Sequence, residues 1–194
     1  MHCVQSLPED YRKIYEIDLQ KNKKTALLLN ILGSVMGIIM VLAMHFVIPI
    51  GTLFSMENGF ADYCLRFVVL IVGIIVYIIL HEWVHGRVMR FYGARQVKFG
   101  FTGLYAFAGS KEDYFAKKAY IVIALAPLVL WGVVLLAINL LVGGAWFWVV
   151  YWIQVMNVTG AVGDLFVTVK FSKMPADILV NDDGVSMRVY SREG

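Results

Sequence analysis

The stretch 119–163 contains no Asp, Glu, Lys or Arg. A single helix of this length, about 45 residues, would overshoot a bilayer, because about 20 residues span the hydrocarbon core. Gly143-Gly144 interrupts the run near its middle, which predicts two spans, roughly 119–142 and 146–169, joined by a short loop. Ala126-Pro127 predicts a kink in the first of these spans. A chain with this stretch is therefore expected to fold in a membrane.

Two further apolar runs bring the number of expected spans to four, at about 25–50 and 63–89. The composition agrees, because the chain is 60% hydrophobic and only 16% charged, with a mean hydropathy of +0.72. We therefore expect an all-α integral membrane protein with one four-span domain, 25–170. A polar segment, 1–24, precedes the domain and a polar tail, 171–194, follows it.

The polar segments carry weaker signals. In 1–24 the capping-box pattern Ser6-Leu7-Pro8-Glu9 predicts a short amphipathic helix on the membrane surface. Apolar and polar residues alternate over 97–107, which predicts a short membrane-surface β-hairpin between the second and third spans, although an amphipathic loop explains the pattern equally well. Ser110, followed by two acids, predicts the start of the next helix. In the tail, Ile178-Leu179-Val180 and the segment Val185 to Tyr190 flank the turn-forming Asn181-Asp182-Asp183-Gly184, which predicts a second hairpin.

The distribution of basic residues predicts the topology. Lysines and arginines gather in the first 24 residues, in the connection between the second and third spans, and in the tail, whereas the other two loops hold almost none. The positive-inside rule then places both termini in the cytoplasm of a multi-pass protein, and the compact form suggests a prokaryotic plasma membrane. The basic residues lie scattered at span ends, so the expected partner is the lipid bilayer and not a nucleic acid.

The second span carries His81-Glu82-Trp83-Val84-His85 near its end. Residues four apart lie on one face of a helix, so His81 and His85 form a pincer for a divalent metal, with zinc the first expectation. Glu82 can accept a proton from water at such a metal. Ionisable groups inside a span are costly in free energy, so their presence here favours a metal site. The alternative is a pair of histidines at the membrane interface beside a snorkelling glutamate.

A catalytic zinc site usually has a third protein ligand. Glu112 and Asp113 follow the motif at a plausible distance, but they are also suited to the start of a helix after Ser110. Asp164 lies at the end of the uncharged run, and both it and His81 come about 18 residues, or about 27 Å, after the outer start of their spans. This equal depth favours Asp164, and the alternative is an aspartate that snorkels at the inner interface.

Asn157 is a candidate for substrate binding. It precedes Asp164 by seven residues, which is two helical turns, so the two should face the same side. Asn157 could then hydrogen-bond a substrate backbone or hold Asp164 in place. A polar contact between packed helices explains this asparagine equally well.

Together these features resemble a known family. The His81-Glu82-Trp83-Val84-His85 motif in a membrane helix, Ala126-Pro127 in the next span and Asn-xx-Gly-xx-Gly-Asp in the last resemble site-2 protease type intramembrane metalloproteases. More narrowly, they resemble the related membrane zincin peptidase family. The resemblance covers roughly 63–170, the three-helix catalytic core. It implies zinc bound by the two histidines and Asp164, with Glu82 catalytic.

The last segment departs from the best-known site-2 pattern, which has a proline after the asparagine and Leu-Asp-Gly around the ligand. Here Gly160 stands in place of that proline, and Gly163-Asp164-Leu165 stands in place of the triplet.

The expected activity is therefore zinc-dependent intramembrane or membrane-proximal hydrolysis of a peptide bond in a membrane protein or peptide. A non-catalytic zinc-binding membrane adaptor, or pseudoprotease, is the alternative, although a purely structural site does not need Glu82. A transporter with histidine and carboxylate in its path is disfavoured because the sequence shows no internal repeat.

Overall fold

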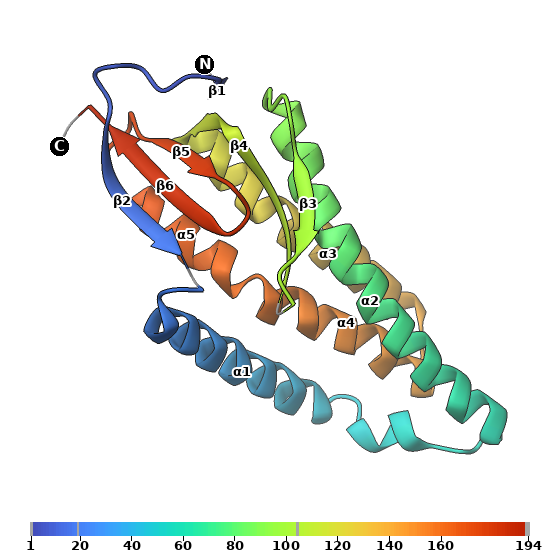
Figure 1. The fold of residues 1–194 in the computed structure, drawn as a ribbon. Helices are drawn as coiled ribbons and strands as arrows, with labels where there is room; N and C mark the ends of the chain where they lie inside the picture. Colours follow the sequence, from blue (N-terminus) through green and yellow to red (C-terminus); the bar gives the residue numbers. More distant parts are fainter. Residues whose placement is uncertain (1, 19, 104, 193–194) are drawn as a thin grey trace. The chain divides into compact units, whose positions relative to one another are not determined.

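The computed structural model describes residues 2–18, 20–103 and 105–192. The chain forms two compact units, which are described separately (Figure 1). The sheet unit consists of Met1–Leu29, His81–Pro127 and Gly163–Gly194. The helical unit consists of Asn30–Leu80 and Leu128–Val162.

Within the described residues, four helical stretches are long and apolar enough to cross a membrane, as expected of an integral membrane protein. They are α1 (Lys23–His45), α2 (Phe60–Phe91), α3 (Lys117–Leu141) and the stretch Gly144–Ser172. The last comprises a short 3₁₀ turn (Gly144–Trp146), α4 (Phe147–Gly160) and α5 (Val162–Ser172). A further 3₁₀ turn, Ile50–Phe54, follows α1. The fourth span is thus interrupted at Ala161, which the apolar sequence did not reveal.

The expectation of an all-α protein is wrong, because the described part of the chain also forms a six-stranded sheet. Its strands are β1 (Cys3–Val4), β2 (Arg12–Asp18), β3 (Lys98–Phe101), β4 (Ala106–Ala116), β5 (Leu179–Asp182) and β6 (Ser186–Ser191). Their order is β1-β4-β5-β6-β2, with β3 also paired to β4, and all pairs are antiparallel. The sheet belongs entirely to the sheet unit (Figure 1).

The first 24 residues contribute strands where the sequence predicted an amphipathic helix. Pro8 starts a turn, since its carbonyl accepts a hydrogen bond from the Tyr11 backbone at 3.1 Å. The chain then pairs with β6 from Arg12 onwards. Alternate side chains of β2 face the core, where Tyr15 packs and Ile17 is buried. This pairing, made with the far end of the chain, outweighs the local capping signal.

Ser110 does not start a helix, because β4 continues to Ala116. The Asp113 carboxylate, expected at a helix N-terminus, instead accepts hydrogen bonds from Ser110 Oγ at 2.5 Å and the Arg95 backbone at 3.0 Å. Asn181 Nδ2 donates to the Asp113 carbonyl at 3.0 Å, and the β4–β5 register shifts across this segment. The polar cluster therefore stabilises a bulge in β4.

Both predicted hairpins are confirmed. Strand β3 pairs with the first half of β4, in the region 97–107, although residue 104 lies outside the described part of the chain. Strand β5 pairs with β6 in the tail. Asp183 closes that second turn, where its Oδ1 accepts hydrogen bonds from the Val185 and Ser186 backbones.

The sheet unit has one hydrophobic core between the sheet and three helices. Met89 of α2, Ile123 of α3 and Phe171 of α5 pack in it with Val180 of β5 and Val189 of β6. All five side chains are at most 2% exposed. The sheet thereby fixes those segments of α2, α3 and α5 that carry the candidate site.

The helical unit has its own core around Trp148 and Tyr151, which pack with Leu53. Beside it the guanidinium of Arg66, 1% exposed, donates to the carbonyls of Thr52, Leu53 and Ser55 and pairs with Asp62 at 3.0 Å. Arg66, near the start of α2, thus holds the backbone of Thr52 to Ser55 in its turn.

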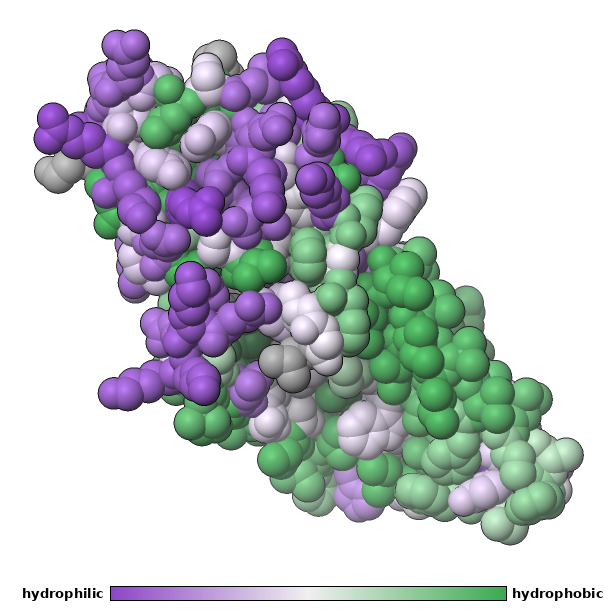
Figure 2. Space-filling view, viewed as in Figure 1, coloured by the Kyte–Doolittle hydropathy of each residue, from purple (hydrophilic) through white to green (hydrophobic). Residues whose placement is uncertain are grey.

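Large apolar side chains remain exposed along the spans. Examples are Leu28, Ile38, Ile71, Ile79, Val133 and Leu136, each more than half exposed. Hydrophobic residues also dominate the visible face of the helical unit, whereas hydrophilic residues dominate that of the sheet unit (Figure 2). The apolar surface along the spans is suited to contact with lipid and not with water.

Candidate metal centre

The α2 helix presents His81 and His85 on one face, as their spacing predicted. Both side chains are buried. Their ring centroids lie 4.9 Å apart with the planes at 77°, so the rings do not stack. Each can therefore direct a nitrogen to a common point.

The helix break at Ala161 places Asp164 in the first turn of α5. A carboxylate is favourable there because the helix N-terminus carries a partial positive charge. Asp164 Oδ2 lies 3.5 Å from His81 Nε2 and 3.6 Å from His85 Nε2. The structure therefore brings the predicted third side chain to both histidines within the sheet unit.

The donor atoms of these three residues all lie within 4.8 Å of one another, close enough to hold a metal ion together. Zinc bonds to nitrogen and oxygen of about 2.0–2.2 Å in a tetrahedron separate two ligand atoms by about 3.4 Å. The nitrogen–oxygen separations of 3.5 and 3.6 Å match that value, whereas a good N–H···O hydrogen bond is shorter, at about 2.7–3.2 Å. Two imidazoles and one carboxylate are also a typical donor set for catalytic zinc.

Glu82 adjoins the first ligand and is partly exposed. It does not belong to the three-residue donor cluster. Its carboxylate lies near the backbone N–H of Ala108, in β4. Glu82 therefore remains free for a role other than metal binding.

His85 is oriented by the next helix. Its Nδ1 lies 2.9 Å from the carbonyl oxygen of Ile123 in α3. Ligand histidines commonly make such a bond with their second nitrogen, which fixes the ring and increases its basicity toward a metal. Sequence reasoning missed this contact because it involves a backbone atom.

Asp182 was also missed, because Asn181-Asp182-Asp183-Gly184 was interpreted only as a turn. Its buried carboxylate accepts hydrogen bonds from Tyr120 Oη at 2.6 Å and the Gly184 backbone at 2.8 Å. Burial raises the pKa of Asp182 to about 6, although the Tyr120 hydrogen bond opposes this shift. Its charge also acts on His85 and Glu82, so the tail contributes to the electrostatics of the site.

The rival third ligands lie elsewhere. Glu112 is exposed on β4, and the Asp113 carboxylate accepts hydrogen bonds from Ser110 and from the Arg95 backbone. Neither belongs to the cluster that the two histidines form with Asp164.

Asn157 lies in the helical unit, where its side chain is fully buried. Its Oδ1 accepts a hydrogen bond from Tyr77 Oη at 2.9 Å, and its Nδ2 donates to the Leu128 carbonyl at 3.1 Å. These are polar contacts between packed helices, the alternative that the sequence left open. Seven residues make two helical turns only in an unbroken helix, whereas this helix is interrupted at Ala161. A role in substrate binding stays a prediction.

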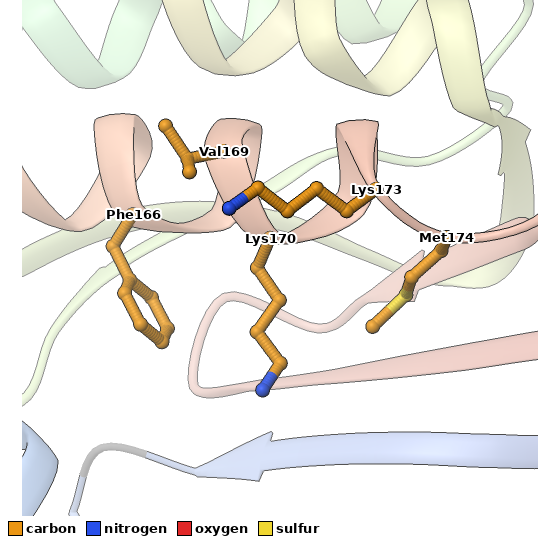
Figure 3. Close-up of a pocket in the computed structure, with 5 residues that line it drawn as sticks. All are labelled: Phe166, Val169, Lys170, Lys173 and Met174. Carbon is orange, nitrogen blue, oxygen red and sulfur yellow. The ribbon is translucent and has the colours of Figure 1, made fainter.

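A separate hollow of about 390 Å³ lies on α5 (Figure 3). It is lined by Phe166, Val169, Lys170, Lys173 and Met174. Lys170 Nζ lies 4.3 Å from the centre of the Tyr15 ring, a cation–π contact with β2. None of the lining residues is a candidate metal ligand, so the hollow is distinct from the metal centre.

The chain resembles a known family over the region that contains the candidate site. A family model described as "Putative zincin peptidase" matches residues 74–179, more than half of the chain, including both histidines and Asp164. An uncharacterized 24.7 kDa protein of Pyrococcus woesei is 31% identical over 129 residues, which cover 61% of this chain. The match covers 53% of that relative, about half its length. No solved structure matches the chain. The chain belongs to this family, whose model is described as "Putative zincin peptidase".

Proposed function

We propose that this protein is a zinc metalloendopeptidase of the site-2 protease type, which hydrolyses peptide bonds within or close to a membrane. The observation that carries the proposal is that two buried histidines, His81 and His85, and the half-buried Asp164 bring their donor atoms together, with Glu82 next to His81 in sequence. Membership of the zincin peptidase family supports it, as do helices long enough to span a bilayer.

The ligand residues and Glu82 have different tasks in this mechanism. Zinc, when bound by the two histidines and Asp164, supplies a Lewis acid that makes water nucleophilic at neutral pH. Glu82 accepts the proton of the attacking water and then donates it to the leaving amine. The Ala108 N–H lies near the Glu82 carboxylate that carries out both steps.

The substrate is proposed to be a membrane protein or a membrane-bound peptide. A helical substrate must unwind locally, because helical hydrogen bonds hide its peptide groups. Strand β3 pairs with β4, and no further strand in the described ranges pairs with it. Its other edge is therefore suited to an extended peptide. The charge pattern supports a site near the cytoplasmic face of a prokaryotic plasma membrane, with both termini in the cytoplasm.

The decisive test compares wild type with Glu82→Gln in proteoliposomes that also contain a pool of single-span model substrates. We expect about one zinc per chain in both proteins and a loss of cleavage of at least 100-fold in the variant, since general acid–base catalysis contributes about 10²–10⁴-fold. Glu112→Gln, which changes an exposed acid on β4, is the matched control and should cleave normally.

Full cleavage by Glu82→Gln would refute the assignment of Glu82. Zinc bound by wild type without cleavage of any substrate in the pool would instead favour the non-catalytic adaptor.

A further inference from the structure

Pro127 lies inside α3, ten residues after the helix begins. In a regular α-helix the backbone N–H of residue 127 donates to the carbonyl of residue 123. Proline has no such N–H, and its ring also crowds that carbonyl away from the helix axis. The Ile123 carbonyl therefore lacks the backbone donor that a regular helix would give it.

A side chain donates to this carbonyl instead. His85 Nδ1 lies 2.9 Å from the Ile123 oxygen, and both residues are buried. A carbonyl oxygen can only accept, so Nδ1 must carry the proton. In a neutral imidazole the lone pair then resides on Nε2, the atom that lies 3.6 Å from Asp164 Oδ2.

We propose that Pro127 is a positioning residue for the metal centre. By withholding a backbone donor, it reserves the Ile123 carbonyl for His85 and so selects the ring orientation and tautomer that bind metal. The inference rests on the metal site of the proposed function and deepens it. All three residues, Ile123, Pro127 and His85, lie in the sheet unit.

Any other amino acid at position 127 would bring an N–H to the same oxygen. The helical hydrogen bond would draw the carbonyl back along the axis of α3, away from His85. His85 would then lose the partner that fixes its ring. Since proline is the least favourable residue in a helix interior, its presence here accords with a role that requires the missing donor.

The test separates the missing donor from the shape of the proline ring. One variant, Pro127→Ala, restores the N–H. A second carries lactic acid at position 127, so that an ester replaces the amide: it has the alanine side chain but neither the N–H nor the ring. Pro175→Ala, which changes a proline in the loop between α5 and β5, serves as the control.

Two properties are measured for each protein in detergent. The first is the protonation of the His85 nitrogens in zinc-free protein, from nitrogen-15 NMR of labelled histidine assigned with His85→Gln. The second is the zinc dissociation constant, from competition with a chelating dye. We expect the alanine variant to lose the Nδ1–H preference and to bind zinc about 10–100-fold more weakly, as is usual when a partner of a ligand histidine is lost. The lactic acid variant and Pro175→Ala should resemble wild type in both.

The opposite results would overturn the inference. An alanine variant with a higher melting temperature, unchanged zinc affinity and an unchanged tautomer would show that Pro127 only shapes the helix. A lactic acid variant as weak as the alanine variant would assign the effect to the ring.

The two readouts also separate this inference from the proposed function. If wild type binds no zinc, yet Pro127→Ala alone disturbs the His85 tautomer, the proposed function fails and the positioning of the imidazole stands. If wild type binds zinc and cleaves substrate, but Pro127→Ala changes neither readout, the inference fails and the function stands.

Discussion

Replacing Asp182 with asparagine should stabilise the zinc-free protein at neutral pH. Burial raises the pKa of this carboxyl from 3.8 to about 6, against the opposing hydrogen bonds from Tyr120 Oη and the Gly184 backbone. The charged form is therefore disfavoured in the folded state. The protonated carboxyl makes its whole contribution to the free energy of unfolding below about pH 4, and this contribution is lost as the pH rises through about 6.

The magnitude follows from the shift. A difference of about two pKa units, at about 1.4 kcal/mol per unit, corresponds to about 3 kcal/mol of unfolding free energy lost between pH 4 and pH 7. Asparagine resembles the protonated acid and carries no charge. Tyr120 can accommodate it, because its hydroxyl can turn its proton to Met187 Sδ at 3.1 Å and accept from the new amide.

Chemical unfolding in detergent with a chelator present, from pH 4 to pH 8, measures the effect. A chelator is needed because a cation at His85 would favour the charged carboxylate. Asp182→Asn should match wild type at pH 4 and exceed it by up to about 3 kcal/mol above pH 7. Parallel pH profiles for the two proteins would refute the reasoning.

Asp177→Asn is the control, because the pKa of Asp177 is lowered where that of Asp182 is raised, so its effect on stability should have the opposite sign. The Arg192 backbone N–H donates to this carboxylate at 2.8 Å and, as the largest cause, lowers its pKa. The stability that Asp177 contributes is therefore present at neutral pH and is lost as the pH falls. The variant should be less stable than wild type at pH 7 and equal to it at low pH.

Three further changes test the site and its support. Asp164→Ala removes one of three ligands, so zinc per chain after dialysis should fall from about one to near zero; retained zinc would move the third ligand elsewhere. In Gly109→Ala the new Cβ would lie 2.2 Å from the Gly184 backbone nitrogen, so unfolding should become easier by about 1–3 kcal/mol. Gly143 has open space where a Cβ would lie, so Gly143→Ala should change the melting temperature little. Equal melting temperatures for the two variants would contradict the close packing at Gly109. In Arg66→Lys the ammonium group cannot reach all the carbonyls that the guanidinium binds, so the free energy of unfolding should fall by about 2 kcal/mol. An unchanged melting temperature would show that this turn does not depend on Arg66.

Much of the candidate site could be predicted because its signals are local or are set by the membrane. The spacing of His81 and His85 determines that they share a helix face wherever the helix lies. Because a bilayer has a nearly constant thickness, the position of a residue along a span gives its depth in the membrane. His81 and Asp164 have the same expected depth, which favoured Asp164 over Glu112 as the third ligand.

The two hairpins could be predicted because their strands are neighbours in the sequence, but the complete sheet could not, because its other pairs join distant parts of the chain. Arg12 pairs with Ser191, from opposite ends of the sequence, and that partner gives the first segment a strand conformation despite its helix-capping pattern. Asp182 reaches the site only through this sheet, and the Ile123 carbonyl reaches His85 only through helix packing. The lengths of the apolar runs, the distribution of basic residues and the spacing of the motif are carried by the sequence itself, so it determined the spans, the two hairpins and the candidate metal ligands. Strands β1 and β2, the pairing of β4 with β5, the break before Asp164 and the groups that surround the candidate ligands were decided by tertiary structure, because hydrogen bonds and packing between remote segments outweigh local preference.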